Sequence, residues 1–86
     1  MTVLFHKNFE KQYKKLSRNS QHKFKDRIQI FMSDVFNPIL NNHPLRGKYA
    51  GYRSIEVSGD LRAIYKTVGN DVFLFVTIGS HNYLYS

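Results

Sequence analysis

The spacing of apolar residues between positions 24 and 35 constrains this chain more than any other feature of its sequence. The apolar side chains recur at i, i+4, i+7, i+8 and i+11, at Phe24, Ile28, Phe31, Met32 and Val35. A 3.6-residue period of this kind predicts an amphipathic helix with one apolar face. Because such a face must be buried against another element, we expect its partner surface elsewhere in the 86 residues.

Two further elements are predicted before this helix. The β-branched and aromatic run at residues 2–5 predicts a short first strand. Asn8 is a candidate N-cap for a first helix, whose apolar face holds Phe9, Tyr13 and Leu16. The candidate N-caps of the second helix are Ser17, Asn19 and Ser20. Pro38 is expected to end that helix, because it biases Asn37 away from helical angles.

The second half of the chain predicts a sheet. Three strands are expected at residues 52–57, 61–67 and 72–78, joined by turns at Ser58-Gly59 and Gly69-Asn70. We therefore expect an α+β domain of residues 1–86 in the order β-α-α-β-β-β. Its two N-terminal helices pack on one face of a small antiparallel sheet. Simple alternation places Val72, Leu74, Val76 and Ile78 on one face of the last strand.

Composition narrows the functional classes. The chain carries 13 Lys and Arg against six Asp and Glu, for a net charge of +7. Eight basic and two acidic residues lie before residue 28, a bias that predicts attraction to a polyanion or an acidic protein. A solvated, lysine-rich helix face explains the charge alone equally well. The absence of cysteine favours the cytoplasm and excludes disulfides and thiolate zinc sites. No apolar run is long enough to span a membrane.

Six polar residues of the C-terminal half form a candidate catalytic set: His43, Glu56, Asp60, Arg62, His81 and Tyr85. If the strands form a meander, residues that enter the sheet and residues that leave it can meet at one end. Two imidazoles and a guanidinium then supply a base, an acid and a cation for metal-independent RNA cleavage. Histidine suits both proton transfers because its unperturbed pKa is about 6.5.

Each of these residues also has a structural alternative. Glu56 can pair across strands with Arg62 or Arg53, and Asp60 can serve only the turn. His43 can be an ordinary loop residue before a proline, and residues 83–85 can form a packing flap over the sheet. The four histidines show no metal-ligand spacing, so no metal site or cofactor is expected.

The C-terminal half resembles a known family of toxins. HPLRGKYAGYRSIEVSGDLRAIYK, followed by FVTIGSHNYLY, is similar to the RelE/ParE superfamily of type II toxin–antitoxin toxins, and most of all to its YafQ-like branch. The pattern spans Asn42 to Tyr85, and the N-terminal LFHKNFEKQYKKL also fits. The resemblance implies a RelE-like fold and an endoribonuclease that cuts mRNA on the ribosome. It also implies an acidic antitoxin partner, through which the complex can bind DNA.

The resemblance also assigns roles to positions of this chain. His43 matches the family's proton acceptor before the sheet, and His81 matches the C-terminal histidine that acts as general acid. Arg62 matches the arginine at the scissile phosphate. Asp60 matches an acidic residue that contributes to catalysis, and Tyr85 matches the terminal aromatic that positions RNA. The basic residues expected to hold RNA are Arg46, Lys48, Arg53, Lys14 and Lys15.

Two departures from the YafQ-like pattern leave other functions open. Glu56 stands where that branch has a histidine, and Leu61 stands where it has a tryptophan. The missing tryptophan removes a ring on which a base could stack, and such stacking contributes about 1–3 kcal/mol per base. This loss predicts an altered codon preference or a weakened activity. The alternatives are a non-catalytic gyrase inhibitor of the ParE type and a degenerate toxin that acts as an antitoxin-binding co-repressor. The presence of both His43 and His81 disfavours the gyrase inhibitor.

Overall fold

The computed structural model describes residues 1–85. Its elements in chain order are β1 (Thr2–Phe5), α1 (Lys7–Lys14), α2 (Arg18–Ser33), the 3-10 helix η1 (Pro38–Leu40), β2 (His43–Pro44), the 3-10 helix η2 (Gly47–Tyr49), β3 (Arg53–Ser58), β4 (Leu61–Thr67), β5 (Val72–Ser80) and α3 (His81–Tyr85). The α+β class and the order of the main elements are as expected from the sequence. The short strand β2 and the helix α3 are additions that periodicity did not predict.

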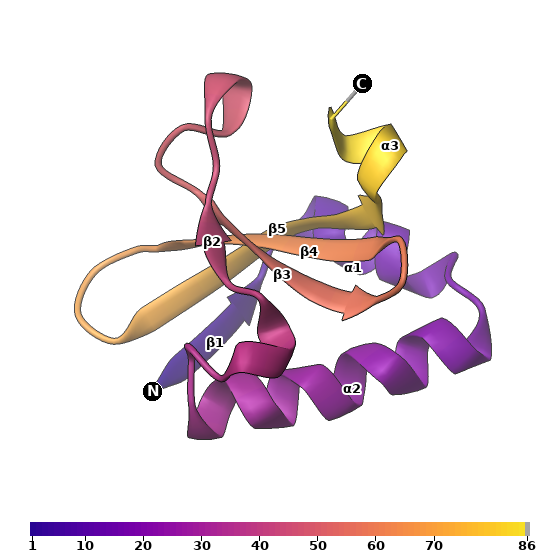
Figure 1. Cartoon of the computed structure of the whole chain (residues 1–86), viewed down its shortest axis with the longest axis horizontal. Helices are drawn as coiled ribbons and strands as arrows, with labels where there is room; N and C mark the ends of the chain where they lie inside the picture. Colours follow the sequence, from indigo (N-terminus) through magenta and orange to yellow (C-terminus); the bar gives the residue numbers. More distant parts are fainter. Residues whose placement is uncertain (86) are drawn as a thin grey trace.

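The strands form one sheet in the order β1-β5-β4-β3-β2 (Figure 1). The strands β2 to β5 pair antiparallel with their neighbours, as a meander. The strand β1 instead pairs parallel with β5, with Thr2 opposite Val72 and Phe5 opposite Phe75. The sheet is therefore mixed at this edge rather than antiparallel throughout. A parallel neighbour requires a long crossover connection, which the helices and the meander provide.

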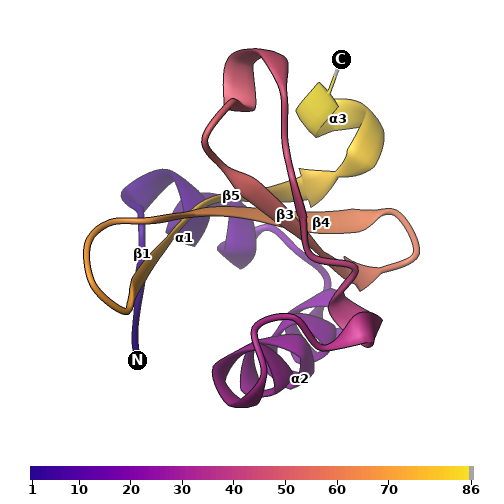
Figure 2. The same ribbon diagram turned by 60° about the vertical axis from the view of Figure 1, so that its left-hand side comes forward.

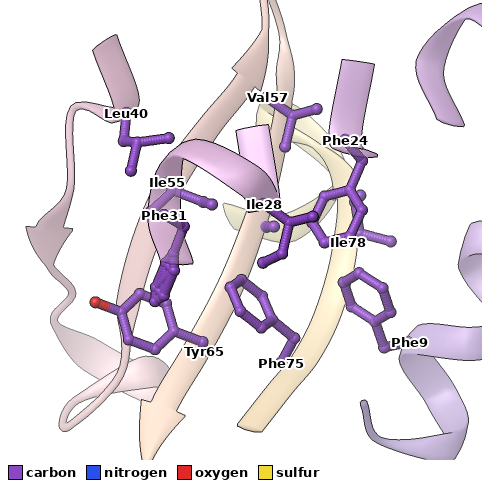
Figure 3. Packing of buried hydrophobic residues seen from close by; sticks show 11 residues of the cluster. Phe9, Phe24, Ile28, Phe31, Leu40, Ile55, Val57, Tyr65, Phe75 and Ile78 are labelled. Atoms are coloured by element: carbon purple, nitrogen blue, oxygen red, sulfur yellow. The ribbon is translucent and has the colours of Figure 1, made fainter. Parts of the chain in front are cut away.

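The helix α2 covers one face of the sheet, called here the inner face (Figure 2). The helix α1 lies along β5, where Gln12 accepts from the backbone N–H of Ile78, and it adds Phe9 to the same core. Phe31 of α2 lies at the centre of this layer, with its ring 5.0 Å from that of Tyr65 and 5.3 Å from that of Phe75. Figure 3 shows these rings packed beside the aliphatic residues of β3 and β5. The buried cluster consists of Phe9, Phe24, Ile28, Phe31, Leu40, Ile55, Val57, Ala63, Tyr65, Phe75 and Ile78.

The helix ends differ in part from the sequence expectation. His6, not Asn8, caps α1, because its Nδ1 accepts a hydrogen bond from the backbone N–H of Asn8. Ser17 caps α2 as expected, through its hydroxyl and the N–H of Ser20. The helix α2 ends at Ser33, before the proline signal is reached. No helix within residues 1–85 has the length and apolar character needed to cross a membrane.

A β-bulge in β5 changes which side chains face the helices. Ile64 pairs with Thr77 and Tyr65 pairs with Phe75, so Val76 is the extra residue. The alternation of β5 therefore shifts by one, and Ile78 joins Phe75 in the inner-face core. Simple alternation placed Ile78 on the face opposite Phe75, which is wrong because of this bulge.

The face of the sheet that points away from the helices is called here the outer face. Alternation along β4 places Arg62, Ile64 and Lys66 on it, because Ala63 and Tyr65 belong to the inner core. Residues 43–52, called here the arm, rise on this side together with α3 (Figures 1 and 2). Ile64 is fully buried although it is absent from the inner core, so the outer face is covered in part.

Candidate active site

The outer face carries a pair of opposite charges beside the β3–β4 turn. Glu56 and Arg62 are direct cross-strand partners in β3 and β4, and their Oε1 and NH2 atoms lie 3.4 Å apart. The NH1 group of Arg62 donates to the backbone carbonyl of Gly59 at 2.7 Å. The Arg62 side chain is 15% exposed and that of Glu56 is 38% exposed. The guanidinium is thus held in place by the sheet and by the β3–β4 turn.

Asn41 connects this pair to His43. Its side-chain amide donates to Oε1 of Glu56 at 3.1 Å, and its backbone carbonyl lies 2.7 Å from Nδ1 of His43. Because a carbonyl only accepts, Nδ1 carries the proton in this bond, and the neutral imidazole keeps its lone pair on Nε2. Asn41 adopts the left-handed conformation with φ 45° and ψ 46°, which asparagine tolerates better than most residues.

The end of β5 and the start of α3 are tied to the same turn. The backbone N–H of His81 donates to the carbonyl of Asp60 at 2.8 Å. Gly79 lies opposite Arg62 in the pairing of β4 with β5. The hydroxyl of Ser80 accepts from the N–H of Tyr83 at 3.1 Å and begins the helix. Asp60, Arg62 and His81 therefore belong to one end of the sheet.

A glycine allows α3 to lie close to the strand that it follows. A Cβ atom on Gly79 would stand 3.3 Å from the Tyr83 side chain and 3.4 Å from that of Leu84, which is tighter than most such contacts. Leu84 is 2% exposed and anchors the short helix on the outer face. The side chain of Tyr85, expected to position RNA, lies outside the described residues.

The strand pairing gives the separation between His43, the candidate base, and Arg62. His43 pairs with Ser54, and Ser54 pairs with Ile64, so this row lies two residues from the row of Glu56 and Arg62. Strand spacing and rise then separate the Cα atoms of His43 and Arg62 by about 12 Å. Side chains that point to the same face can approach a common ligand across such a span.

The basic residues expected to hold RNA fall into two groups. Arg46 and Lys48 are exposed on the arm, on the outer-face side. Arg53 is on the inner side, with its guanidinium over the Phe36 ring at 5.2 Å and its Nε bonded to Asn42. Lys14 and Lys15 are exposed at the end of α1, beside the helices. The structure does not bring the last three residues to the outer face.

The structure also reveals one site residue that the sequence did not indicate. Asn41 lies in an ordinary-looking loop, and only its backbone conformation and its two bonds mark it out. Asparagine after a short helical turn is a known signal for a left-handed cap, so this position could have been found. Within residues 1–85, no three His, Asp or Glu side chains gather as a metal site.

The architecture is that of the RelE-like toxin fold. The crystal structure of YafQ from E. coli strain BL21(DE3) superposes with a TM-score of 0.81 at 22% identity, covering 98% of this chain and 97% of that chain. YafQ in the E. coli DinJ-YafQ toxin-antitoxin complex gives a TM-score of 0.78 at 23% identity, over 98% of this chain and 96% of that chain. The RelB-RelE antitoxin-toxin complex from Methanococcus jannaschii gives 0.76 at 25% identity, over 96% of this chain and 95% of that chain.

The family itself follows from the sequence match. Residues 1–86 match the model of the bacterial toxin of type II toxin-antitoxin systems, YafQ. The chain therefore belongs to the YafQ family, and it is a toxin of a type II toxin–antitoxin system. No curated protein sequence is similar enough to add a further comparison.

Proposed function

We propose that this toxin is a ribosome-dependent endoribonuclease that cleaves mRNA without a metal ion. The observation that carries the proposal is the hydrogen bond between the Asn41 carbonyl and Nδ1 of His43, because it leaves Nε2 as a proton acceptor on the same face of the sheet as the held guanidinium of Arg62. Membership of the YafQ family and the net charge of +7 support an RNA substrate.

The proposed reaction is an in-line displacement at phosphorus. Nε2 of His43 takes the proton of the 2′-hydroxyl, and the 2′-oxygen forms a bond to phosphorus. The bond to the 5′-oxygen breaks, and the protonated imidazole of His81 gives its proton to that oxygen. The products are a 2′,3′-cyclic phosphate and a 5′-hydroxyl. Arg62 offsets the charge that develops on the phosphoryl oxygens.

The two carboxylates have different proposed roles. Glu56 holds Arg62 in position through their ion pair, and it is a positioning residue rather than the base. Asp60 fixes α3 through its backbone carbonyl, and its side chain is exposed in the β3–β4 turn. Tyr85 is proposed to stack on RNA as the terminal aromatic of its family does.

An acidic antitoxin is the proposed protein partner. The DinJ-YafQ and RelB-RelE structures are complexes of this kind. On this chain, Phe5, Phe9 and Phe24 line an apolar hollow of about 340 Å³, with Lys14 and Lys25 at its edge. An amphipathic acidic segment fits such a surface, and its binding is expected to weaken as salt rises. The proposed site of action is the cytoplasm, and the complex is expected to bind DNA through the antitoxin.

The test is expression of the toxin in cells, followed by primer extension on mRNA. The wild type is expected to give discrete cleavage sites, and His43→Gln and His81→Ala are expected to lose roughly 10²–10⁴-fold in rate. Lys23→Gln, an exposed change on α2, serves as the control for charge. Cleavage at the wild-type rate by either histidine variant would remove that residue from the mechanism.

A degenerate toxin is the second candidate. The observation that favours it is that Arg62 already forms an ion pair with Glu56 and a hydrogen bond to the carbonyl of Gly59. Arg62 must give up these contacts before it can bind a phosphate. Growth that continues normally during expression, with antitoxin binding intact, would support this alternative. Inhibition of DNA supercoiling without RNA cleavage would instead point to a gyrase inhibitor.

A further inference from the structure

A second hollow lies on the outer face, beyond the candidate catalytic residues. It has a volume of about 360 Å³ and reaches from the arm to the N-terminus of α1. Its lining includes Tyr49 and Tyr52 of the arm, and His6 and Asn8 at the start of α1. Lys66 and Leu74, which are paired residues of β4 and β5, contribute to its lining. The lining thus combines aromatic, cationic and hydrogen-bonding groups with an aliphatic surface.

The two tyrosines each carry a lysine over the ring. The Nζ atom of Lys48 lies 5.4 Å from the centroid of Tyr49, and that of Lys66 lies 5.4 Å from the centroid of Tyr52. The two rings are themselves 6.0 Å apart in an edge-to-face arrangement. Aromatic rings alternating with cations bind single-stranded nucleic acid, because the rings stack on bases while the cations contact phosphates.

The hollow is also lined by hydrogen-bonding groups, His6 and Asn8. Nδ1 of His6 accepts from the backbone N–H of Asn8 at 3.0 Å, so the proton of the neutral ring is on Nε2 and makes this nitrogen a donor. The side-chain amide of Asn8 has both donors and an acceptor. Groups of this kind can read the edge of a base, which the tyrosines alone cannot do.

The hollow and the candidate catalytic residues share one strand. Arg62 and Lys66 are both on the outer face of β4, four residues apart, which corresponds to about 13 Å along the strand. A strand of RNA whose phosphate contacts Arg62 can therefore place a neighbouring nucleotide over Lys66. Tyr52, packed on Lys66, is then close to the base of that nucleotide.

We propose that the hollow lined by Tyr49, Tyr52, Lys66 and His6 binds the base of a nucleotide next to the cleaved phosphodiester. This inference rests on the proposed RNA-cleaving function and adds a specificity subsite to it. The tyrosine rings provide stacking, Lys66 contacts a phosphate, and the His6–Asn8 side sets the base preference.

The test uses fluorescently labelled 2′-O-methyl hexaribonucleotides that differ in their base. Their binding to the full chain is measured by fluorescence anisotropy at fixed low salt. The 2′-O-methyl group prevents cleavage, so binding is read independently of activity. Tyr52→Leu is expected to weaken binding roughly 5- to 150-fold, the range for one stacked base. Tyr52→Phe keeps the ring and is expected to bind within about twofold of the wild type.

Matched variants separate stacking from charge and from folding. Lys66→Gln is expected to weaken binding more than Lys23→Gln, which removes the same charge from α2. Tyr49→Leu is the second ring variant, used if thermal melting shows that Tyr52→Leu does not fold. Cleavage sites mapped in cells are expected to lose base preference at one position next to the cut when either ring is removed.

The outcomes distinguish the two proposals. If the wild type cleaves mRNA but both leucine variants bind the hexamers like the wild type, the hollow is not a base subsite. If the wild type does not cleave but Tyr52→Leu loses hexamer binding, the hollow binds a base, but the catalytic proposal fails and with it the placement of that base next to a cleaved phosphodiester. A loss of antitoxin binding with unchanged RNA binding would assign the hollow to the protein partner and overturn the inference.

Discussion

Replacing Asn41 tests whether its left-handed backbone organises the site. In Asn41→Gly, the φ of 45° remains accessible, and only the bond to Glu56 is lost. Because Asn41 is exposed and the Glu56 side chain is 38% exposed, that bond contributes about 0.5–1 kcal/mol after solvent screening. Asn41→Ala loses the same bond and also strains the backbone, since left-handed angles cost an alanine about 1–2 kcal/mol.

The comparison of the two variants reverses an ordinary ranking. At most exposed positions, alanine is more stable than glycine by about 0.4–1 kcal/mol, because it restricts the unfolded chain. At position 41 we expect alanine to be less stable than glycine by about 0.5–1 kcal/mol, after this entropy gain offsets part of the strain. In a domain of this length, the difference corresponds to roughly 2–8 °C in Tm. Urea unfolding and thermal melting measure it.

The same pair of variants has a functional readout. Asn41→Gly keeps the carbonyl near Nδ1 of His43, so kcat for RNA cleavage is expected to stay near the wild-type value. Asn41→Ala is expected to shift the carbonyl and so to disturb the orientation of His43. A general base contributes roughly 10²–10⁴-fold to the rate, and we expect kcat to fall by part of this factor with little change in KM. The reasoning is refuted if alanine at this position is as stable as glycine and cleaves equally well.

Three further predictions concern single side chains. Glu56→Gln keeps an acceptor for Asn41 but removes the charge opposite Arg62. Arg62 is then free to contact phosphate, so KM for RNA should fall about 1.5- to 5-fold. A 100-fold loss of kcat would instead make Glu56 the base. Gln12→Ala removes the acceptor for the N–H of Ile78 and should cost about 1–3 kcal/mol in urea unfolding, whereas Gln12→Glu should not. Ser54→Ala removes a buried hydroxyl that has no partner within residues 1–85 and should raise stability by about 1 kcal/mol; a lower Tm would show that the hydroxyl is bonded.

Local signals were sufficient to predict the frame of this fold. The 3.6-residue period and Ser17 located α2, and the turn residues separated the three main strands. The cross-strand pair of Glu56 and Arg62 was one of the anticipated alternatives, and the structure confirms it. These features depend on neighbours in sequence or on one hairpin, so short-range rules describe them well.

The remaining features depend on contacts between distant segments. The parallel pairing of β1 with β5 joins residues about 70 positions apart, and no local pattern encodes it. The bulge at Val76 moves Ile78 into the core, and it arises from sheet packing rather than from a turn signal. Alternation along β3 puts Arg53 on the inner side, opposite Tyr65. The expectation that Arg53 holds RNA followed its positive charge and not this alternation.

The central claim is that His43, Arg62 and His81 act together on one phosphodiester on the outer face. A crystal structure of the toxin with a 2′-O-methyl RNA dinucleotide tests it most directly. We predict a phosphate oxygen within hydrogen-bond reach of the Arg62 guanidinium, with the two imidazoles on opposite sides of the phosphorus. A dinucleotide seated on the helices of the inner face, or one that contacts only a single imidazole, would contradict the claim.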